Sequence, residues 1–307
     1  MATVINVNGR IAQGTDATIP VLDHGFLYGE GVYEVCRTYH GYPFLFDRHL
    51  RRLRNSADMI ALPVPFTDGG VLDLVVETLA TASLARPGVP GPEAYIRLLL
   101  TRGVGDLSYD PAACSRPSVV VIVKAHAAPP ADVYDAGVQV ALVPIIRNHP
   151  QSLNPLIKSN NLLNNALAMQ QALAHGGFEA VMRNHHGEIS ECSQSNLFVV
   201  RSGSVHTPPL EAGLLAGITR EFLFEVAQAI GVPMAERTLK DEDLLGADEA
   251  FLTSTTREVV PIVRVDDRVI GAGRPGPVTR ALLEGFRRRT DALTGGGRSA
   301  QTSAFSA

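Results

Sequence analysis

The sequence has few cysteines, and their placement argues against two kinds of site. Only three are present, Cys36, Cys114 and Cys192, and they are far apart, with no Cys-x-x-Cys pair and no neighbouring histidine cluster. An odd and scattered set of this kind predicts neither a disulfide framework nor a zinc site. We therefore expect no metal in the functional site and a reducing, cytoplasmic location.

The sequence also lacks the features of membrane and nucleic-acid-binding proteins. No apolar run approaches the ~20 residues that a membrane span needs, and residues 1–8 lack the basic and apolar regions of a secretory signal. The formal net charge of −4 provides no basic surface for nucleic acid or anionic lipid. We expect neither of these partners.

What the sequence does contain is enough apolar material for a large core. The chain has 307 residues, of which 45% are hydrophobic and 19% charged, which is sufficient for two domains. Alternating strands and helices predict a small α/β domain over residues 1–125. Residues 126–136 have linker composition, residues 137–289 form the predicted larger domain, and the polar tail over 290–307 is predicted to be disordered.

Local signals predict the elements of the first domain. Asn8-Gly9 lies between two short β-type runs and is a strong hairpin signal. Asp47 is suited to be the N-cap of the helix that follows it. Apolar periodicity predicts helices over about 48–61 and 71–85 and strands over 94–101 and 118–124.

One lysine in the second domain has an unusual setting. Lys158 is the only lysine between Lys124 and Lys240, and it lies between an apolar run and a Ser-Asn-Asn cluster. Burial favours the neutral amine, which attacks carbonyl groups and forms Schiff bases. A solvated lysine at a helix end is the plainer interpretation of this residue alone. The helix predicted after it has an apolar stripe at Leu162, Ala166, Met169 and Leu173.

A predicted hairpin follows that helix and contains an acid. Phe178 to Arg183 and Glu188 onward are predicted strands, joined by a turn at His185-His186-Gly187. Glu191 lies in the second strand among apolar residues, where a carboxylate needs a positive partner unless it faces water at a sheet edge. A Schiff-base lysine and an acid that keeps a pyridinium nitrogen protonated are together what pyridoxal phosphate (PLP) requires.

Four segments occur in a fixed order along the chain: Lys158-Ser-Asn-Asn-Leu, Glu191-Cys-Ser-Gln-Ser-Asn-Leu-Phe, Gly217-Ile-Thr-Arg and Thr253-Ser-Thr-Thr. Their order and spacing resemble the class IV (fold-type IV) PLP-dependent aminotransferases, which include branched-chain aminotransferases, D-amino-acid aminotransferases and aminodeoxychorismate lyases. The likeness runs from about Val4 to about Arg288. It implies a two-domain α/β fold whose larger domain has a β-barrel-like core.

The resemblance assigns roles to the matching residues. Lys158 forms the Schiff base with PLP, and Glu191 keeps the ring nitrogen protonated. In His49-Leu-Arg-Arg-Leu53, the arginine before the last leucine, Arg52, binds the phosphate with its planar fork, although a solvated arginine is the alternative. The remaining cofactor contacts lie at a helix N-terminus and in a hydroxyl-rich turn, and they are Gly217, Ile218, Thr219 and Thr255. Thr219 alone would equally suit a helix cap.

The implied substrate contacts combine features of two subfamilies. They are Tyr33, Tyr95, Arg97, Thr255 and Thr256. Tyr95-Ile-Arg97 and Arg37 resemble the branched-chain enzymes, whereas Val32-Tyr-Glu-Val35 resembles the D-amino-acid enzymes. Cys192 replaces a common glycine, and Leu163 replaces a tyrosine that many branched-chain enzymes have.

From this resemblance we expect a transaminase that moves an amino group from a branched-chain L-amino acid to 2-oxoglutarate by a ping-pong mechanism. A D-amino-acid or (R)-amine transaminase, or an aminodeoxychorismate lyase, is the alternative, and a PLP-binding protein without turnover is a third. The family also implies a homodimer or a larger homo-oligomer. The loop over 102–109 is the candidate segment that completes the partner's site.

Overall fold

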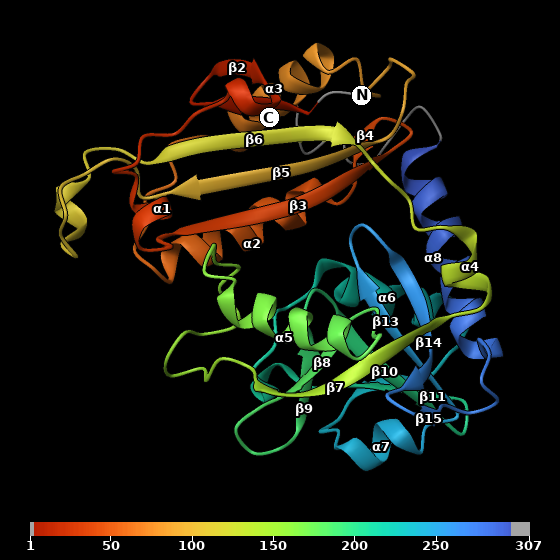
Figure 1. Cartoon of the computed structure of the whole chain (residues 1–307). Coiled ribbons are helices and arrows are strands. Elements are labelled where there is room, and N and C mark those ends of the chain that lie inside the picture. Colours follow the sequence, from red (N-terminus) through yellow and green to blue (C-terminus); the bar gives the residue numbers. More distant parts are fainter. Residues whose placement is uncertain (1–2, 296–307) are drawn as a thin grey trace. The chain divides into compact units, whose positions relative to one another are not determined.

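The computed structural model describes residues 3–295, which form two compact units (Figure 1). The first unit comprises residues 3–127, 157–161 and 290–295, and the second comprises residues 128–156 and 162–289. The segment that contains Lys158 therefore groups with the N-terminal unit, whereas the sequence places it in the larger domain.

A six-stranded sheet forms the centre of the first unit. The strand order is β2-β1-β6-β5-β3-β4, and Figure 1 shows β6, β5 and β3 side by side. The strands are β1 (Val4–Val7), β2 (Arg10–Gln13), β3 (Gly31–Tyr39), β4 (Tyr42–Pro43), β5 (Ala94–Thr101) and β6 (Ser118–Ala125). The Asn8-Gly9 hairpin is confirmed, and both residues have the positive φ, 52° and 87°, that this tight turn requires.

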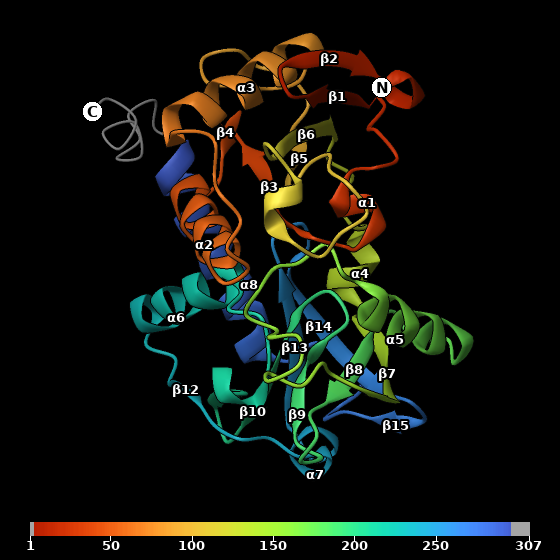
Figure 2. The ribbon, with the colours of Figure 1, turned by 90° about the vertical axis from the view of Figure 1, so that its left-hand side faces the viewer.

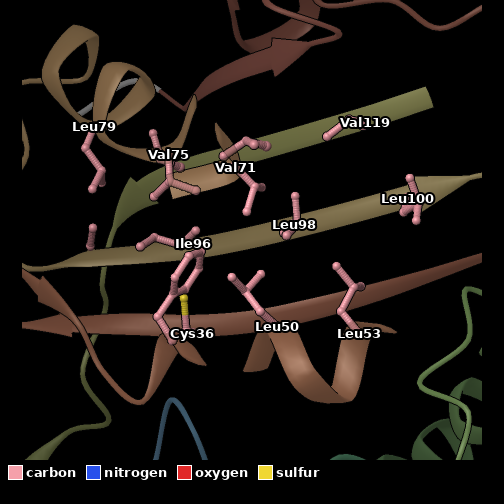
Figure 3. Packing of buried hydrophobic residues seen from close by; sticks show 14 of the residues in the cluster. Cys36, Leu50, Leu53, Val71, Val75, Leu79, Ile96, Leu98, Leu100 and Val119 are labelled. Atoms are coloured by element: carbon pink, nitrogen blue, oxygen red, sulfur yellow. The ribbon is translucent and has the colours of Figure 1, made fainter. Parts of the chain in front are cut away.

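Two helices, α2 (Phe46–Asp58) and α3 (Asp68–Thr81), cover one face of this sheet. Side chains alternate along a strand, so every second residue of β3, β5 and β6 points toward these helices. Figure 3 shows the resulting core, in which the labelled side chains are Cys36, Leu50, Leu53, Val71, Val75, Leu79, Ile96, Leu98, Leu100 and Val119. The alternate residues of these strands point to the opposite face of the sheet.

The helix starts in this unit differ from the predicted ones. Asp47 is not the N-cap of α2, because Leu45 occupies that position with a left-handed φ of 50° and Asp47 lies in the first turn. In the next helix, α3, the N-cap is Thr67, whose hydroxyl accepts a hydrogen bond from Gly70 N at 3.1 Å. The shorter helices are η1 (Gly14–Asp16), α1 (His24–Leu27) and η2 (Pro111–Ala113).

The second unit is built on a nine-stranded sheet. Its order is β12-β11-β10-β13-β14-β7-β8-β9, with β15 paired to β14. The strands are β7 (Val138–Ile146), β8 (Ala180–Arg183), β9 (Ile189–Cys192), β10 (Asn196–Arg201), β11 (Ser204–Thr207), β12 (Met234–Glu236), β13 (Glu249–Ser254), β14 (Glu258–Val265) and β15 (Arg268–Val269). The terminal strand β9 also contacts β10, so the sheet curls into the barrel-like core that the sequence predicts.

Three helices of the second unit pack on this curled sheet, and they are α4 (Ala131–Asp135), α5 (Leu163–Ala174) and α6 (Ile218–Ile230). The unit also contains η3 (Leu210–Ala212), α7 (Asp241–Leu245) and α8 (Pro277–Thr294) up to residue 289. Figure 2 shows α5 beside β7 and β8. The predicted apolar stripe of α5 is wrong, because the buried residues are Ala168 and Ala172 and Leu173 is exposed. Small side chains allow this helix to approach the sheet closely.

The end of the chain also differs from the prediction. Helix α8 continues to Thr294, so residues 290–294, which the sequence assigns to a disordered tail, are helical. The rest of that predicted tail, residues 296–307, lies outside the described residues. Within residues 3–295, none of the helices combines the length and the apolar character that a bilayer span requires.

Candidate active site

The backbone around Lys158 is tied to the sheet of the first unit. Tyr33 N donates to the Lys158 carbonyl at 2.9 Å, and Asn160 N donates to the Gly31 carbonyl at 2.9 Å. Lys158 N donates to the hydroxyl of Ser56 on α2 at 3.1 Å. These three bonds hold the lysine beside the start of β3, although the sequence suggested a position at the start of a helix.

The Lys158 side chain lies against an aromatic ring. Its Nζ is 4.5 Å from the centroid of the Tyr33 ring, and the Arg97 guanidinium carbon is 4.1 Å from the same centroid. The residue is half-buried. Cations attract the electron-rich face of an aromatic ring, so Tyr33 keeps both cations close to it. The structure thus brings together three of the residues that the sequence selected.

Arg52 is buried on α2, and its orientation is set by an acid that the sequence did not single out. Its Nε and Nη2 donate to Glu34 at 2.7 and 2.8 Å. His49 Nδ1 also contacts Glu34, at 2.7 Å. Burial alone would raise the pKa of Glu34, but the charge and hydrogen bonds of Arg52, with those of His49, lower it to about 2. Arg52 is therefore not a solvated arginine of the helix surface.

The alternation of residues in β3 could have identified Glu34 from the sequence, although no motif pointed to its role. Glu34 alternates with Val32 and Cys36 on β3, and all three side chains are buried. A charged residue on the apolar face of a strand requires a buried partner. Burial also lowers the pKa of His49, which favours the neutral imidazole beside the Glu34 carboxylate.

The other face of the first sheet carries cations stacked on tyrosine rings. The strand register places Val35 opposite Arg97 and Arg37 opposite Tyr95, so these side chains share a face. Arg37 lies 4.0 Å from the centroid of the Tyr39 ring, and Lys124 lies 5.2 Å from that of Tyr95. Guanidinium groups held in this way suit the recognition of carboxylates.

Glu191 in the second unit has the positive partner that burial demands. It is buried on β9, and its Oε1 accepts from Arg147 Nε at 2.7 Å. Its Oε2 accepts from Leu215 N at 3.1 Å. Arg147 Nη1 donates further to Asn164 Oδ1 at 3.2 Å. An edge-strand glutamate in water is thus excluded.

Sequence reasoning missed Arg147. It follows the last residue of β7, and nothing in its local pattern separates it from an ordinary charged residue at a strand end. The parallel pairing of β7 with β8 and the antiparallel pairing of β8 with β9 bring it to Glu191. Only the order of strands in the sheet contains that information.

The start of α6 forms a cradle with free backbone donors. Gly217 is the N-cap and has no side chain to cap the helix. A Cβ on Gly217 would collide with Asn196 Oδ1, so a larger residue would require the Asn196 side chain to move. Ile218 and Thr219 are buried in the first turn, and Thr219 does not serve as the cap. The hydroxyl of Thr253, opposite Asn196 in the sheet, is buried without a hydrogen-bond partner among the described residues.

Thr255 and Thr256 lie in the turn between β13 and β14 and are half-buried. Arg257, at the end of that turn, donates from Nε to Ser254 Oγ at 3.1 Å. Its guanidinium also pairs with the fully buried Glu179 at 3.0 Å. The turn is therefore anchored at both of its ends.

These donor sets match the groups of PLP. The first unit offers a half-buried amine at Lys158 and an oriented guanidinium at Arg52. The second offers a buried acceptor at Glu191 and, at the start of α6, an uncapped helix N-terminus next to an unpartnered hydroxyl, which suits a phosphate. Within residues 3–295, no group of three or more His, Cys, Asp and Glu side chains is arranged to hold a metal ion.

Comparisons with known proteins show which family this chain is similar to. The family model described as Amino-transferase class IV matches residues 31–265. A protein of Methanocaldococcus jannaschii, provisionally named branched-chain-amino-acid aminotransferase, is 38% identical over 92% of this chain and 95% of its own length. D-alanine aminotransferase of Staphylococcus haemolyticus is 33% identical over 93% of this chain and 97% of its own length.

A solved structure extends the likeness to the fold. The branched-chain amino acid aminotransferase of Escherichia coli superimposes with a TM-score of 0.87 and 29% identity, covering 94% of each chain. The predicted mixed α/β fold with a barrel-like larger unit is thus confirmed.

Proposed function

Because the chain belongs to the class IV aminotransferase family and is therefore a PLP-dependent transaminase, we propose that it moves an amino group from a branched-chain L-amino acid to 2-oxoglutarate. The observation that carries this proposal is the pair of cations on the Tyr33 ring, Lys158 Nζ and Arg97. This pair supports the proposal because a guanidinium, which is suited to bind a carboxylate, lies on the same ring as the proposed reactive amine. The names of the relatives from M. jannaschii and E. coli support the branched-chain donor.

We assign the proton chemistry to two residues. When bound, PLP supplies an electron sink that stabilises negative charge at the substrate α-carbon. Lys158 would hold PLP through its amine, and this amine would also move the proton to and from the substrate α-carbon. Glu191 holds the proton on the ring nitrogen, while Arg147 and Leu215 N fix the carboxylate that does so.

Cofactor binding is assigned to the polar groups described above. Arg52 contributes a guanidinium oriented by Glu34. The remaining contacts come from the start of α6 and from the β13–β14 turn, and they are Gly217, Ile218, Thr219 and Thr255. Backbone N–H groups and hydroxyls bind phosphate without needing further positive charge.

Substrate binding is assigned to the stacked face of the first sheet and to the β13–β14 turn. Tyr95 and the Thr255-Thr256 turn contact the α-carboxylate. Arg97, next to Tyr33, meets the distal carboxylate of glutamate or 2-oxoglutarate. Because one site serves the amino donor and the oxo acid in turn, the reaction proceeds in ping-pong fashion.

A D-amino-acid transaminase is the second candidate function. The segment Val32-Tyr-Glu-Val35 and the 33% identity to a D-alanine aminotransferase both favour it. The two candidates require opposite faces of the substrate α-carbon to meet the Lys158 amine. They therefore differ in the stereochemistry of the donor and share the same reacting groups.

Half-reactions separate the two candidates. The PLP-loaded protein is mixed with L-leucine, D-alanine or (R)-1-phenylethylamine, and loss of the cofactor's visible absorption band is followed. We expect L-leucine to bleach the band fastest. Faster bleaching with D-alanine would replace the first proposal by the second, and pyruvate release from aminodeoxychorismate would indicate a lyase. Lys158→Ala protein should lose both transamination and the borohydride-sensitive band.

We also propose a homodimer or larger homo-oligomer. Two segments of the first unit, residues 19–28 and 103–109, expose large apolar side chains, namely Ile19, Val21, Leu22, Phe26, Val104, Leu107 and Tyr109. The segments are joined by hydrogen bonds from Gly105 N to Leu22 O at 3.3 Å and between His24 Nε2 and Asp106 O at 2.8 Å. Such a patch suits a second copy of the chain. A monomeric sedimentation profile with full activity would contradict this proposal.

A further inference from the structure

We infer that Glu179 is a positioning residue of the active site, because it holds two functional turns of the second unit in place. One is the turn over 193–195, which directly follows the strand of Glu191. The other is the turn over 254–256, which Glu179 reaches through Arg257. The inference rests on the proposed function, since the second turn carries the proposed carboxylate contacts.

The burial of Glu179 and its ion pair indicate that its negative charge has a role beyond stability. Its side chain is completely buried, and that of Arg257 is 15% exposed. A buried carboxylate is costly unless an opposite charge and hydrogen-bond donors satisfy it, and a well-packed apolar pair is often no less stable. Stability alone therefore does not explain this ion pair, whereas precise placement of two turns does.

The first turn is organised around both carboxylate oxygens. Ser195 Oγ donates to Oε2 at 2.8 Å, Ser193 Oγ donates to Oε1 at 3.4 Å, and Gln194 N donates to Oε1 as well. Cys192 N closes the turn with a bond to Ser195 O at 2.8 Å. Glu179 thereby fixes where β9 ends and where β10 begins.

The beginning of β10 leads directly to the phosphate cradle. Asn196, the first residue of β10, donates from Nδ2 to Leu215 O at 3.0 Å and packs against Gly217. Leu215 N in turn donates to Glu191. The turn held by Glu179 thus stands between the proposed ring-nitrogen acid and the start of α6.

The second turn is anchored through the guanidinium of Arg257. Besides Glu179, this group contacts Ser254 Oγ and lies 5.4 Å from the centroid of the Phe178 ring. Tyr134 Oη donates to the Arg257 carbonyl at 3.2 Å. With Ser254 and Arg257 fixed, the two threonines between them have a preset backbone. A carboxylate can then bind without the additional free-energy cost of ordering the turn.

Glu179→Gln tests this role, because glutamine removes the charge opposite Arg257 with little change in shape. We expect KM for L-leucine and D-alanine, which share the α-carboxylate, to rise about tenfold, the size of a typical coupling between contacting residues. The dissociation constant of 4-methylvaleric acid, a carboxylate without a reactive amine, should rise by the same factor. Unchanged KM for both amino acids would overturn the inference, whereas faster bleaching with D-alanine by wild-type protein would overturn only the proposed donor.

A second substitution separates positioning from folding. Glu179→Gln leaves the Arg257 charge buried and unpaired, so the unfolding temperature should fall. Adding Arg257→Met removes that charge, and we expect the unfolding temperature to recover while the dissociation constant of 4-methylvaleric acid stays about tenfold raised. Recovery of both quantities would show that Glu179 serves stability alone and would refute the positioning role.

The matched control is a half-exposed pair of the same residue types in the same unit. Arg289 Nη2 lies 2.8 Å from Glu225 Oε2, and their side chains are 41% and 33% exposed. Glu225→Gln combined with Arg289→Met should leave the dissociation constant of 4-methylvaleric acid within about twofold of wild type, because exposed pairs contribute little. An equal rise in the control would mean that loss of any ion pair loosens the unit, and it would also overturn the inference.

Discussion

Each unit of the chain contains a buried carboxylate paired with an arginine, and the two pairs exchange roles. In the first unit Glu34 holds Arg52, and the arginine is the proposed ligand contact. In the second unit Arg147 holds Glu191, and the carboxylate is the proposed contact. A charged group that must meet a ligand inside a protein needs an opposite charge behind it, which orients it and offsets its burial.

The largest effect is expected from removing the supporting member of the second pair. Arg147→Met leaves Glu191 buried without its countercharge, and we expect a loss of about 3–5 kcal/mol in the free energy of unfolding. Urea denaturation measures it. Adding Glu191→Gln should restore much of that loss, and a double variant as unstable as the single one would show that Arg147 acts through other contacts.

Removing the contacting member of the same pair should affect catalysis more than folding. Glu191→Gln leaves the ring nitrogen without its acid, and we expect kcat to fall by about 10²–10³, as for loss of one preorganised electrostatic partner. Steady-state kinetics with saturating PLP measure it, and Glu211→Gln, an exposed acid of the same unit, serves as the control. A variant with normal kcat would remove Glu191 from the proposed mechanism.

The Glu34–Arg52 pair makes the free energy of unfolding depend on pH. The pKa of Glu34 is lowered from 4.5 to about 2 in the folded chain. Its contribution, about 3 kcal/mol, is fully present above the unfolded pKa and is lost as the pH falls through the folded pKa. The difference in unfolding free energy between wild type and Glu34→Gln should therefore narrow between pH 4.5 and 2. Exposed Glu77 should show no such narrowing when changed to glutamine.

The smallest effect concerns the contacting member of the first pair. Arg52→Met should weaken PLP binding about 10- to 100-fold, the size of a lost hydrogen bond to a charged group, while leaving the affinity for pyridoxal, which has no phosphate, nearly unchanged. Equilibrium dialysis with the two compounds measures the ratio. Equal weakening of both would show that Arg52 supports the fold of α2 and does not contact the phosphate.

The comparison of the two pairs also shows how far sequence reasoning reaches. The motifs selected Arg52 and Glu191, the members proposed to meet the ligand, but neither of their supports. Glu34 had a local signal in its alternation with buried Val32 and Cys36, whereas Arg147 had none. Which residue supports a buried charge depends on which segments of the chain lie near it. Segments that are distant in sequence come together only in the folded chain.

The same limit explains the errors in the elements. Local turn chemistry correctly predicted the Asn8-Gly9 hairpin. The predicted N-cap of α2, Asp47, was wrong because Leu45 adopts a left-handed conformation that its helix propensity does not indicate. The predicted buried face of α5 was wrong because the helix packs closely on the sheet, and the small side chains of Ala168 and Ala172 are buried there in place of the larger leucines.

The sequence by itself determined the composition, the mixed α/β class, the family resemblance and the residues proposed to bind PLP, since each depends on residue type and order. Tertiary structure alone decided that the Lys158 segment joins the first unit, that Arg147 meets Glu191, and that Glu179 links two turns. The reason is that a buried charge selects its partner by distance in space. That distance depends on strand order and register, which no local pattern of side chains encodes.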